Sequence, residues 1–328
     1  MHTTYNISSA TPDFFLIGFP GLEDYHYWLS IPFTIMYLIA ILGNVTIIFI
    51  VKHEENLHMP MYVFLCVLAV VDLGLSTSVL PEMLNVMLFK IHVISFQACF
   101  LQMFLVDFFS GLESSILAVM AYDRYVAIYR PLHYTSLLTA TSIVKILTAL
   151  LIRCLILTGV IAILASRLPY CSLTNVSHCY CYHIAVAKLA CTDITLNSSY
   201  GLFVAFLIIG TDLIFIAFTY VKILKAVLKL GSKAAKHKAF NTCGSHLFII
   251  LYCYSSGLFS FLTNRFGQSF PQYIKILLSV LYLIVPPALN PIIYGLRTKE
   301  IREGFHKYLF RTKIKPISFN MKDKHEVN

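Results

Sequence analysis

The chain has 328 residues, of which 58% are hydrophobic and 12% are charged, and its formal net charge is +9. Because an average soluble domain has about 25% charged residues, this composition excludes an ordinary soluble domain and indicates a membrane protein. The basic residues are divided among the segments between apolar stretches, so the charge does not predict a nucleic-acid-binding face.

Seven long apolar stretches follow one another and nearly exhaust the chain. A helix needs about 20 apolar residues to cross a bilayer. The stretches stay apolar throughout, whereas strands of an outer-membrane barrel alternate polar and apolar residues. The sequence therefore predicts an all-α membrane protein, a seven-transmembrane helix bundle. The predicted spans are residues 28–51, 62–80, 100–120, 143–165, 200–221, 247–262 and 274–294.

The distribution of basic residues predicts the orientation of these spans. Residues 1–51 contain no Lys or Arg, whereas basic residues gather after the third, fifth and seventh spans, beginning at Arg124, Lys222 and Arg297. The positive-inside rule then places the N-terminus outside the cell and these segments in the cytoplasm. We expect a multi-pass protein of the plasma membrane. We see no cleavable signal peptide, so the first span is expected to act as the targeting signal.

Three regions follow from this topology. Residues 1–26 form an extracellular N-terminus, residues 27–296 the transmembrane domain, and residues 297–328 a cytoplasmic amphipathic helix and tail. Asn6 begins a glycosylation sequon on the predicted outer side. In the last region Ile301, Phe305 and Leu309 recur every four residues among basic residues, which predicts a short helix on the inner leaflet, near anionic headgroups.

Ionisable groups inside the spans are functional candidates because each costs about 2.5–3.5 kcal/mol to insert. Asp72 and Glu113 are predicted to meet near the bundle centre with Asn44 and Asn290. Such oxygen ligands suit a small hard cation such as sodium. A hydrogen-bond network with one protonated carboxyl is the alternative. The full set of these groups is Asp72, Asp107, Glu113, Asp123, Arg124, Arg153 and Asp212.

Asp123, Arg124 and Tyr125 end the third span. Because a guanidinium can exchange its neighbouring carboxylate for other partners, this tripeptide is a candidate conformational switch. An Asp–Arg pair at a membrane interface is otherwise a simple anchor.

Cysteines gather on the predicted outer side. Cys99 begins the third span, and Cys171, Cys179, Cys181 and Cys191 lie between the fourth and fifth spans. Disulfides are expected in that oxidising compartment, but spacing alone does not fix their connectivity. A zinc site of Cys179 and Cys181 with His178 and His183 is the less favoured alternative.

Four strings follow one another at the ends of predicted spans: LHMPMY at 57–62, MAYDRYVAI at 120–128, KAFNTC at 238–243 and PALNPIIY at 287–294. Together they resemble motifs of the odorant receptors among the rhodopsin-like (class A) G-protein-coupled receptors. The string GFPGLE at 18–23 resembles the class I, or fish-like, branch, whose members are often associated with water-soluble odorants such as carboxylic acids. Departures from the family pattern are Tyr129, Asn241 and Thr219, and span six has Ser255-Ser256-Gly257 where many receptors have proline.

The resemblance implies a mechanism and partners. A small volatile ligand binds within the bundle, the sixth span swings outward, and the stimulatory olfactory G protein raises cAMP; no enzymatic activity and no resident cofactor other than sodium are expected. It also implies disulfides Cys99–Cys181 and Cys171–Cys191. Tyr220 and Tyr294 are expected to join Arg124 in the switch.

The same resemblance places the ligand between the outer halves of the spans. Helical spacing groups two sets of residues on inward faces: Val106, Asp107, Ser110 and Gly111 on span three, and Tyr254, Gly257, Phe261 and Arg265 on span six. Arg265 suits a carboxylate ligand, because its planar fork binds carboxylates bidentately. Alternatively it anchors the helix at the interface. Asp107 would repel an acid unless it is protonated or paired, so an amine ligand is the rival.

A membrane transporter or channel is the alternative function. Such a protein would favour internal repeats and broken helices, and we find no repeated pair of segments. An intramembrane enzyme would need a nucleophile with its base, and His246 has no evident partner on its helical face.

Overall fold

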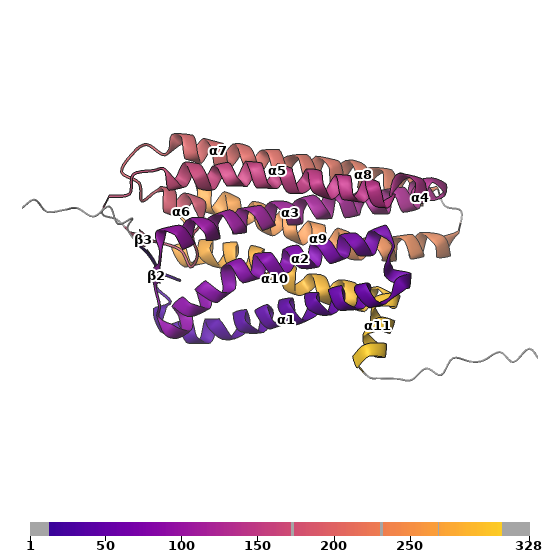
Figure 1. Cartoon of the computed structure of the whole chain (residues 1–328), viewed down its shortest axis with the longest axis horizontal. Coiled ribbons are helices and arrows are strands. Elements are labelled where there is room, and N and C mark those ends of the chain that lie inside the picture. Colours follow the sequence, from indigo (N-terminus) through magenta and orange to yellow (C-terminus); the bar gives the residue numbers. More distant parts are fainter. Residues whose placement is uncertain (1–12, 172–173, 230–231, 268, 310–328) are drawn as a thin grey trace, which may run out of the picture.

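The computed structural model describes residues 13–171, 174–229, 232–267 and 269–309. Seven helices that are long and apolar enough to cross a membrane lie side by side along one axis (Figure 1), which confirms the predicted bundle. These spans are α1 (His26–His53), α2 (Pro60–Leu84), α3 (Phe96–Tyr129), α5 (Ala140–Ser166), α7 with α8 (Thr195–Ala205 and Thr211–Leu228), α9 (Lys233–Phe266) and α10 (Gln272–Arg297).

Short elements complete the fold. They are β1 (Phe14–Leu16), β2 (Val93–Ile94), β3 (Asn175–Val176), α4 (Tyr134–Leu137), α6 (His183–Ala187), α11 (Lys299–Leu309), the 3-10 turns Glu23–Tyr25, Glu55–Leu57 and Pro131–His133, and the π-helical turns Asn85–Phe89 and Phe206–Gly210.

Helix starts follow local chemistry. Ser95 and Thr139 precede α3 and α5, and their hydroxyls accept hydrogen bonds from Ala98 N (3.3 Å) and Ser142 N (3.2 Å). These bonds satisfy backbone donors that have no partner within the helix. Pro60 opens α2, where its missing N–H costs no helical hydrogen bond.

Proline in α10 also explains a contact with α1. Pro291 has no N–H, so the carbonyl of Pro287, four residues earlier, loses its helical donor. The amide of Asn44 donates to this carbonyl at 2.9 Å. The helix itself runs unbroken through all three of its prolines.

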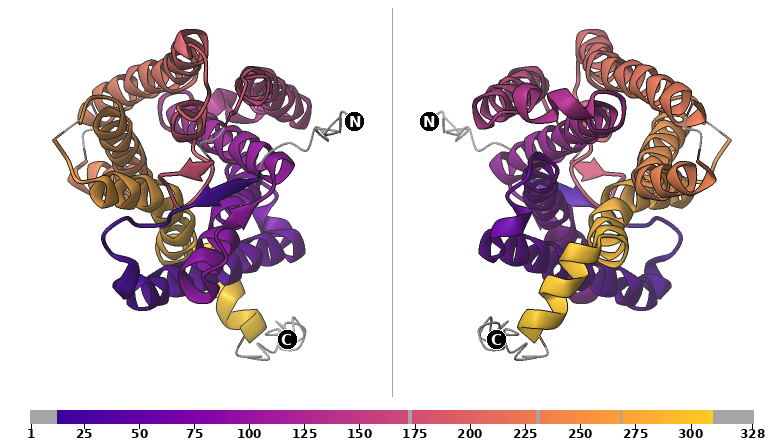
Figure 2. Two further views of the ribbon diagram at one scale, coloured as in Figure 1. Left: turned by 90° about the vertical axis from the view of Figure 1, so that its left-hand side faces the viewer. Right: turned by 90° about the vertical axis from the view of Figure 1, so that its right-hand side faces the viewer.

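A small sheet caps the end of the bundle that carries the disulfides, called here the disulfide end. The strand β1 lies in the middle, antiparallel to β2 and parallel to β3. Figure 2 shows these strands crossing the centre of that end. Phe14 and Leu16 are fully buried while Phe15 is exposed, the alternation expected of a strand with one covered face. The sequence analysis predicted no strand here.

Two disulfides fix the loop between α5 and α7. Cys99 is joined to Cys181, and Cys171 to Cys191. Cys179 keeps a free buried thiol, and burial raises the pKa of that thiol. Since Cys181 is engaged in a disulfide, the zinc alternative does not hold.

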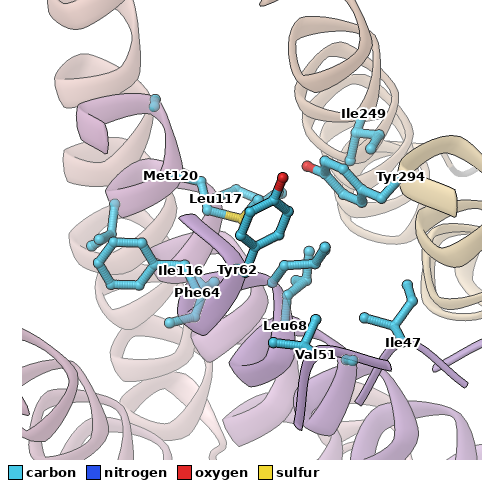
Figure 3. Packing of buried hydrophobic residues seen from close by; sticks show 14 of the residues in the cluster. Ile47, Val51, Tyr62, Phe64, Leu68, Ile116, Leu117, Met120, Ile249 and Tyr294 are labelled. Carbon is cyan, nitrogen blue, oxygen red and sulfur yellow. The ribbon is translucent and has the colours of Figure 1, made fainter. Parts of the chain in front are cut away.

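The opposite end, called the Arg124 end, is filled by the largest apolar cluster. Figure 3 shows Tyr62, Leu68 and Met120 packed in it, with the hydroxyls of Tyr62 and Tyr294 pointing into the same interhelical space. The amphipathic helix α11 is docked here. Lys307 Nζ lies 2.6 Å from Glu54 Oε1, and this hydrogen bond lowers the pKa of Glu54.

Candidate functional site

A cavity lies near the disulfide end, among α3, α5, α7, α9 and α10 and beneath the α5–α7 loop. It is called here the main cavity because most of the predicted ligand-binding residues line it. Its volume is about 180 Å³. Of the eight residues predicted to bind ligand, six line it: Val106, Asp107, Ser110, Gly111, Gly257 and Phe261. The side chain of Arg265 lies outside the described residues, and so does Asn6.

Tyr254 is not among the residues that line this cavity. It lies three residues from Gly257 toward the Arg124 end, and its hydroxyl turns to Ser114 Oγ at 2.8 Å. It lines instead a second, apolar cavity of about 280 Å³ between α8 and α9, together with Glu113 and Leu213. The two cavities share Ser110, Gly257, Phe261 and Tyr282, so Tyr254 lies one turn deeper beside the same space.

The walls of the main cavity are mostly apolar, with a few polar groups. Ile161, Val204 and Leu283 contribute hydrocarbon, and Asp107, His183 and Tyr282 are among the polar side chains. A mostly apolar hollow with a few placed polar groups is the usual form of a small-molecule site. Its volume suits a small molecule with one polar group.

The loop contributes residues that the sequence analysis missed, namely Tyr180, Tyr182 and His183. The Cys99–Cys181 disulfide places them over α3, and Cys181 N donates to Gln102 Oε1 at 2.9 Å. The Cys99–Cys181 pairing was therefore the signal that could have identified them.

Glycines bring the walls together. A Cβ at Gly257 would lie 2.8 Å from Tyr282 Cε2, and one at Gly201 would lie 2.8 Å from His183 Cε1. Since real Cβ atoms do not approach so closely, these positions require glycine or a shift of the ring.

A buried polar network joins four spans beside the cavity. Arg153 Nη2 lies 2.9 Å from Asp212 Oδ1, and Asp212 Oδ2 accepts from the hydroxyls of Ser114 (2.9 Å) and Ser115 (3.0 Å). Ser114 connects onward to Tyr254 on α9. The π-helical turn before α8 presents the carbonyl of Ile208, which accepts from Arg153 at 3.3 Å. The sequence analysis named Arg153 and Asp212 but did not pair them.

The predicted central network is assembled in part. Asn290 Nδ2 donates to Asp72 Oδ2 at 2.8 Å, and Glu113 Oε1 accepts from Cys253 Sγ at 3.9 Å. Asp72 Oδ1 and Asn290 Oδ1 are buried without a hydrogen-bond partner. Asn44 bonds the carbonyls of Pro287 and Ala40 rather than the carboxyls. Among the described residues, no cluster of three His, Cys, Asp or Glu side chains suits a metal.

At the Arg124 end, two of the five predicted switch residues, Arg124 and Tyr294, line a cavity of about 580 Å³. Arg124 Nη2 lies 3.4 Å from Asp123 Oδ2, and the Tyr134 hydroxyl donates to Asp123 Oδ1 at 2.7 Å. The hydroxyl of Tyr294 is buried without a hydrogen-bond partner.

Two predicted switch residues have other neighbours. The Tyr220 hydroxyl bonds His246 Nδ1 at 3.0 Å, so His246 does have a partner on another helix. The ring of Tyr125 stacks on Tyr129, with centroids 5.3 Å apart. Tyr125 also packs against Ile223, Val227 and Cys243 on α8 and α9, so its neighbours here are apolar and aromatic side chains.

Comparison with known proteins identifies the family. The family model described as "Olfactory receptor" matches residues 33–312. Olfactory receptor 52J3 of Homo sapiens is 49% identical over 88% of this chain and 93% of its own length. Olfactory receptor 52A5 of Homo sapiens is 47% identical over 95% and 99%, and olfactory receptor 51G2 of the same organism is 45% identical over 90% and 94%. With its seven membrane-crossing helices, this chain therefore belongs to the olfactory receptor family of class A G-protein-coupled receptors.

Proposed function

We propose that this receptor binds a small volatile molecule in the main cavity and activates a heterotrimeric stimulatory G protein that raises cAMP. The observation that carries the proposal is the cavity itself, which lies on α3 and α9 beneath a disulfide-fixed loop. The disulfide end faces outside the cell, because disulfides persist in oxidising compartments and the basic segments lie at the other end. The 580 Å³ cavity at the Arg124 end is then the G-protein side.

Signal transfer runs along α9. A ligand that contacts Gly257 and Phe261 acts on the helix that also carries Tyr254 and His246. Tyr254 holds α9 to Ser114, and His246 holds it to Tyr220. A ligand that fits better when α9 has swung outward shifts the population toward that conformation, in which these two bonds are broken.

The ligand class is a small polar odorant, and a carboxylic acid held by Arg265 is the first candidate, since guanidinium groups pair well with carboxylates. The second candidate is an amine or alcohol that donates to Asp107, which lines the cavity. Matched short acids, alcohols, aldehydes and amines, tested on a cAMP reporter, separate the two. Loss of an acid response in Arg265→Ala supports the first, and loss of an amine response in Asp107→Asn supports the second.

The same assay separates a receptor from a transporter or channel. Ligand-dependent cAMP without ion flux is expected. Ion flux without cAMP, in cells where the chain reaches the surface, would overturn the proposal.

We also propose a sodium ion between Asp72 and Glu113. The unpaired buried oxygens Asp72 Oδ1 and Asn290 Oδ1 support it, because sodium takes hard oxygen ligands. Sodium-dependent suppression of basal signalling that disappears in Glu113→Gln is the expected result. If sodium suppresses basal signalling equally in the unaltered receptor and in Glu113→Gln, these residues form a hydrogen-bond network without an ion.

A further inference from the structure

A further hollow lies on the outer surface of the bundle near the Arg124 end, where Leu42, Ile292 and Leu296 are exposed. It is a groove of about 420 Å³ among α1, α10 and α11, with Leu42 and Ile50, Ile292 and Leu296, and Ile301 and Phe305 on its three walls. The stretch of α1 from Leu42 to Ile50 gives it about 12 Å of length. This groove is separate from the main cavity and from the cavity at the Arg124 end.

Glycines shape the groove. A Cβ at Gly43 would lie 2.6 Å from Pro291 Cβ, so α1 and α10 touch at that point. One turn further along α10, a Cβ at Gly295 would have no heavy atom within 4 Å. The helices are therefore held together at Gly43 and leave an open space at Gly295.

The third wall is fixed by contacts of α11. A Cβ at Gly304 would lie 2.5 Å from Ile50 Cγ2, which shows how closely α11 rests on α1. Lys307 bonds Glu54, and the Tyr62 hydroxyl donates to Glu300 Oε2 at 3.3 Å. The groove thus exists before anything binds in it.

The rim of the groove is basic. Arg302 and His306 are exposed and stand one turn apart on α11, where the apolar walls end. The two acidic residues of α11 are engaged elsewhere, Glu300 with Tyr62 and Glu303 with Lys299 at 3.6 Å. One guanidinium nitrogen of Arg302 donates to the Leu296 carbonyl at 3.2 Å, and Arg302 belongs to none of the carboxylate pairs among the described residues.

We infer that this groove binds one anionic phospholipid of the cytoplasmic leaflet, with an acyl chain against Leu42, Ile292 and Phe305 and its phosphate at Arg302. An apolar slot at this depth is filled by hydrocarbon, and a basic rim selects a negative headgroup. The assignment to the cytoplasmic leaflet depends on the orientation proposed above. The shape and the charge of the groove do not depend on it.

Photo-crosslinking tests the inference. The full chain is reconstituted in phosphatidylcholine nanodiscs that contain either phosphatidylserine or phosphatidylcholine with a diazirine on the acyl chain, and labelled peptides are mapped by mass spectrometry. Labels are expected within 42–50 and 291–296, with phosphatidylserine favoured about fivefold, the effect of one basic side chain near an anionic surface.

Two variants with matched controls make the test specific. Gly295→Leu fills the groove and is expected to reduce labelling to background, whereas Gly210→Leu, at an equally open glycine on the opposite part of the bundle, leaves it unchanged. Arg302→Gln is expected to remove the preference for phosphatidylserine, and Lys52→Gln, an exposed charge outside the groove, to preserve it.

Two results would overturn the inference. They are labelling spread evenly over the bundle and equal labelling by both lipids in the unaltered chain. Because the readout is lipid attachment rather than cAMP, a receptor with no odorant response still gives a decisive answer.

Discussion

The hydroxyl of Tyr220 on α8 lies 3.0 Å from Nδ1 of His246 on α9, and this bond joins the helices at the end where a G protein would enter. Both groups are largely enclosed, and His246 is 3% exposed. A buried hydrogen bond between two helices stabilises the conformation in which they are close.

Breaking this bond is expected to activate the receptor without ligand. His246→Leu and Tyr220→Phe each remove about 0.5–1.5 kcal/mol from the closed state, which raises basal cAMP about two- to tenfold. Basal cAMP is measured at equal surface expression. A decrease of basal cAMP in both variants would show that the bond stabilises the active conformation instead.

The Arg153–Asp212 pair is expected to be essential for stability. Removing one partner leaves the other charge buried, so Arg153→Met or Asp212→Asn lowers the free energy of unfolding by about 3–5 kcal/mol. The double variant Arg153→Met with Asp212→Leu removes both charges and is expected to recover most of that loss. Thermal unfolding of the purified receptor measures all three. A double variant no more stable than the single ones would contradict pairing as the cause.

Gly257 is expected to tolerate no side chain. Gly257→Ala places a Cβ against the Tyr282 ring and costs about 1–3 kcal/mol, with weaker ligand potency because both residues line the main cavity. Gly210→Ala is the control, since its Cβ would meet nothing within 4 Å. Equal effects of the two substitutions on unfolding and on potency would exclude the close contact as the reason.

The two neighbouring loop cysteines are expected to behave differently. Cys181→Ser breaks the bond to Cys99 and costs about 2–5 kcal/mol, with loss of surface expression. Cys179→Ser changes a thiol that takes part in no disulfide, so surface expression is retained. Retained expression in Cys181→Ser alone would assign the structural role to a different pair.

Acid is expected to loosen the α5–α7 loop through His178. Burial lowers the pKa of His178 to about 3, below its ordinary value of 6.5. The unfolded loop therefore binds a proton below pH 6.5 while the folded loop does not, so stability is complete above that pH and is lost as the pH falls toward 3.

At pH 5 this loss is about 2 kcal/mol. Hydrogen exchange of residues 174–182 at pH 7.5 and pH 5 measures it, and His178→Phe is expected to reduce the difference. Unchanged exchange of the unaltered loop across this range would contradict a neutral buried His178.

The sequence predicted what hydropathy and helical spacing determine. All seven spans and the inward face of α3 from Val106 to Gly111 follow from these two patterns. On α9 the same spacing placed Gly257 and Phe261 at the main cavity, but helical spacing fixes a face and not a depth. Tyr254 lines the adjoining cavity one turn deeper.

Helical spacing could not predict contacts between segments that lie far apart in the sequence. Tyr180 and His183 reach the cavity because a disulfide draws the loop over α3. The pairing of Arg153 with Asp212 depends on how α5 and α8 lie against each other. The strand β1 has too few residues for an alternation to be read, and its partners lie far along the chain.

The position of β1 has a consequence for biosynthesis. Leu16 N donates to His92 O, and Phe15 N donates to Thr174 O, so the central strand needs partners made after the second and after the fourth span. Its hydrogen-bonding edges must therefore stay open while about half of the receptor is translated and inserted. Such long-range pairing forms slowly and leaves unpaired edges exposed to wrong partners. Folding of this end of the receptor is therefore complete only after the fourth span and the loop that follows it have been made.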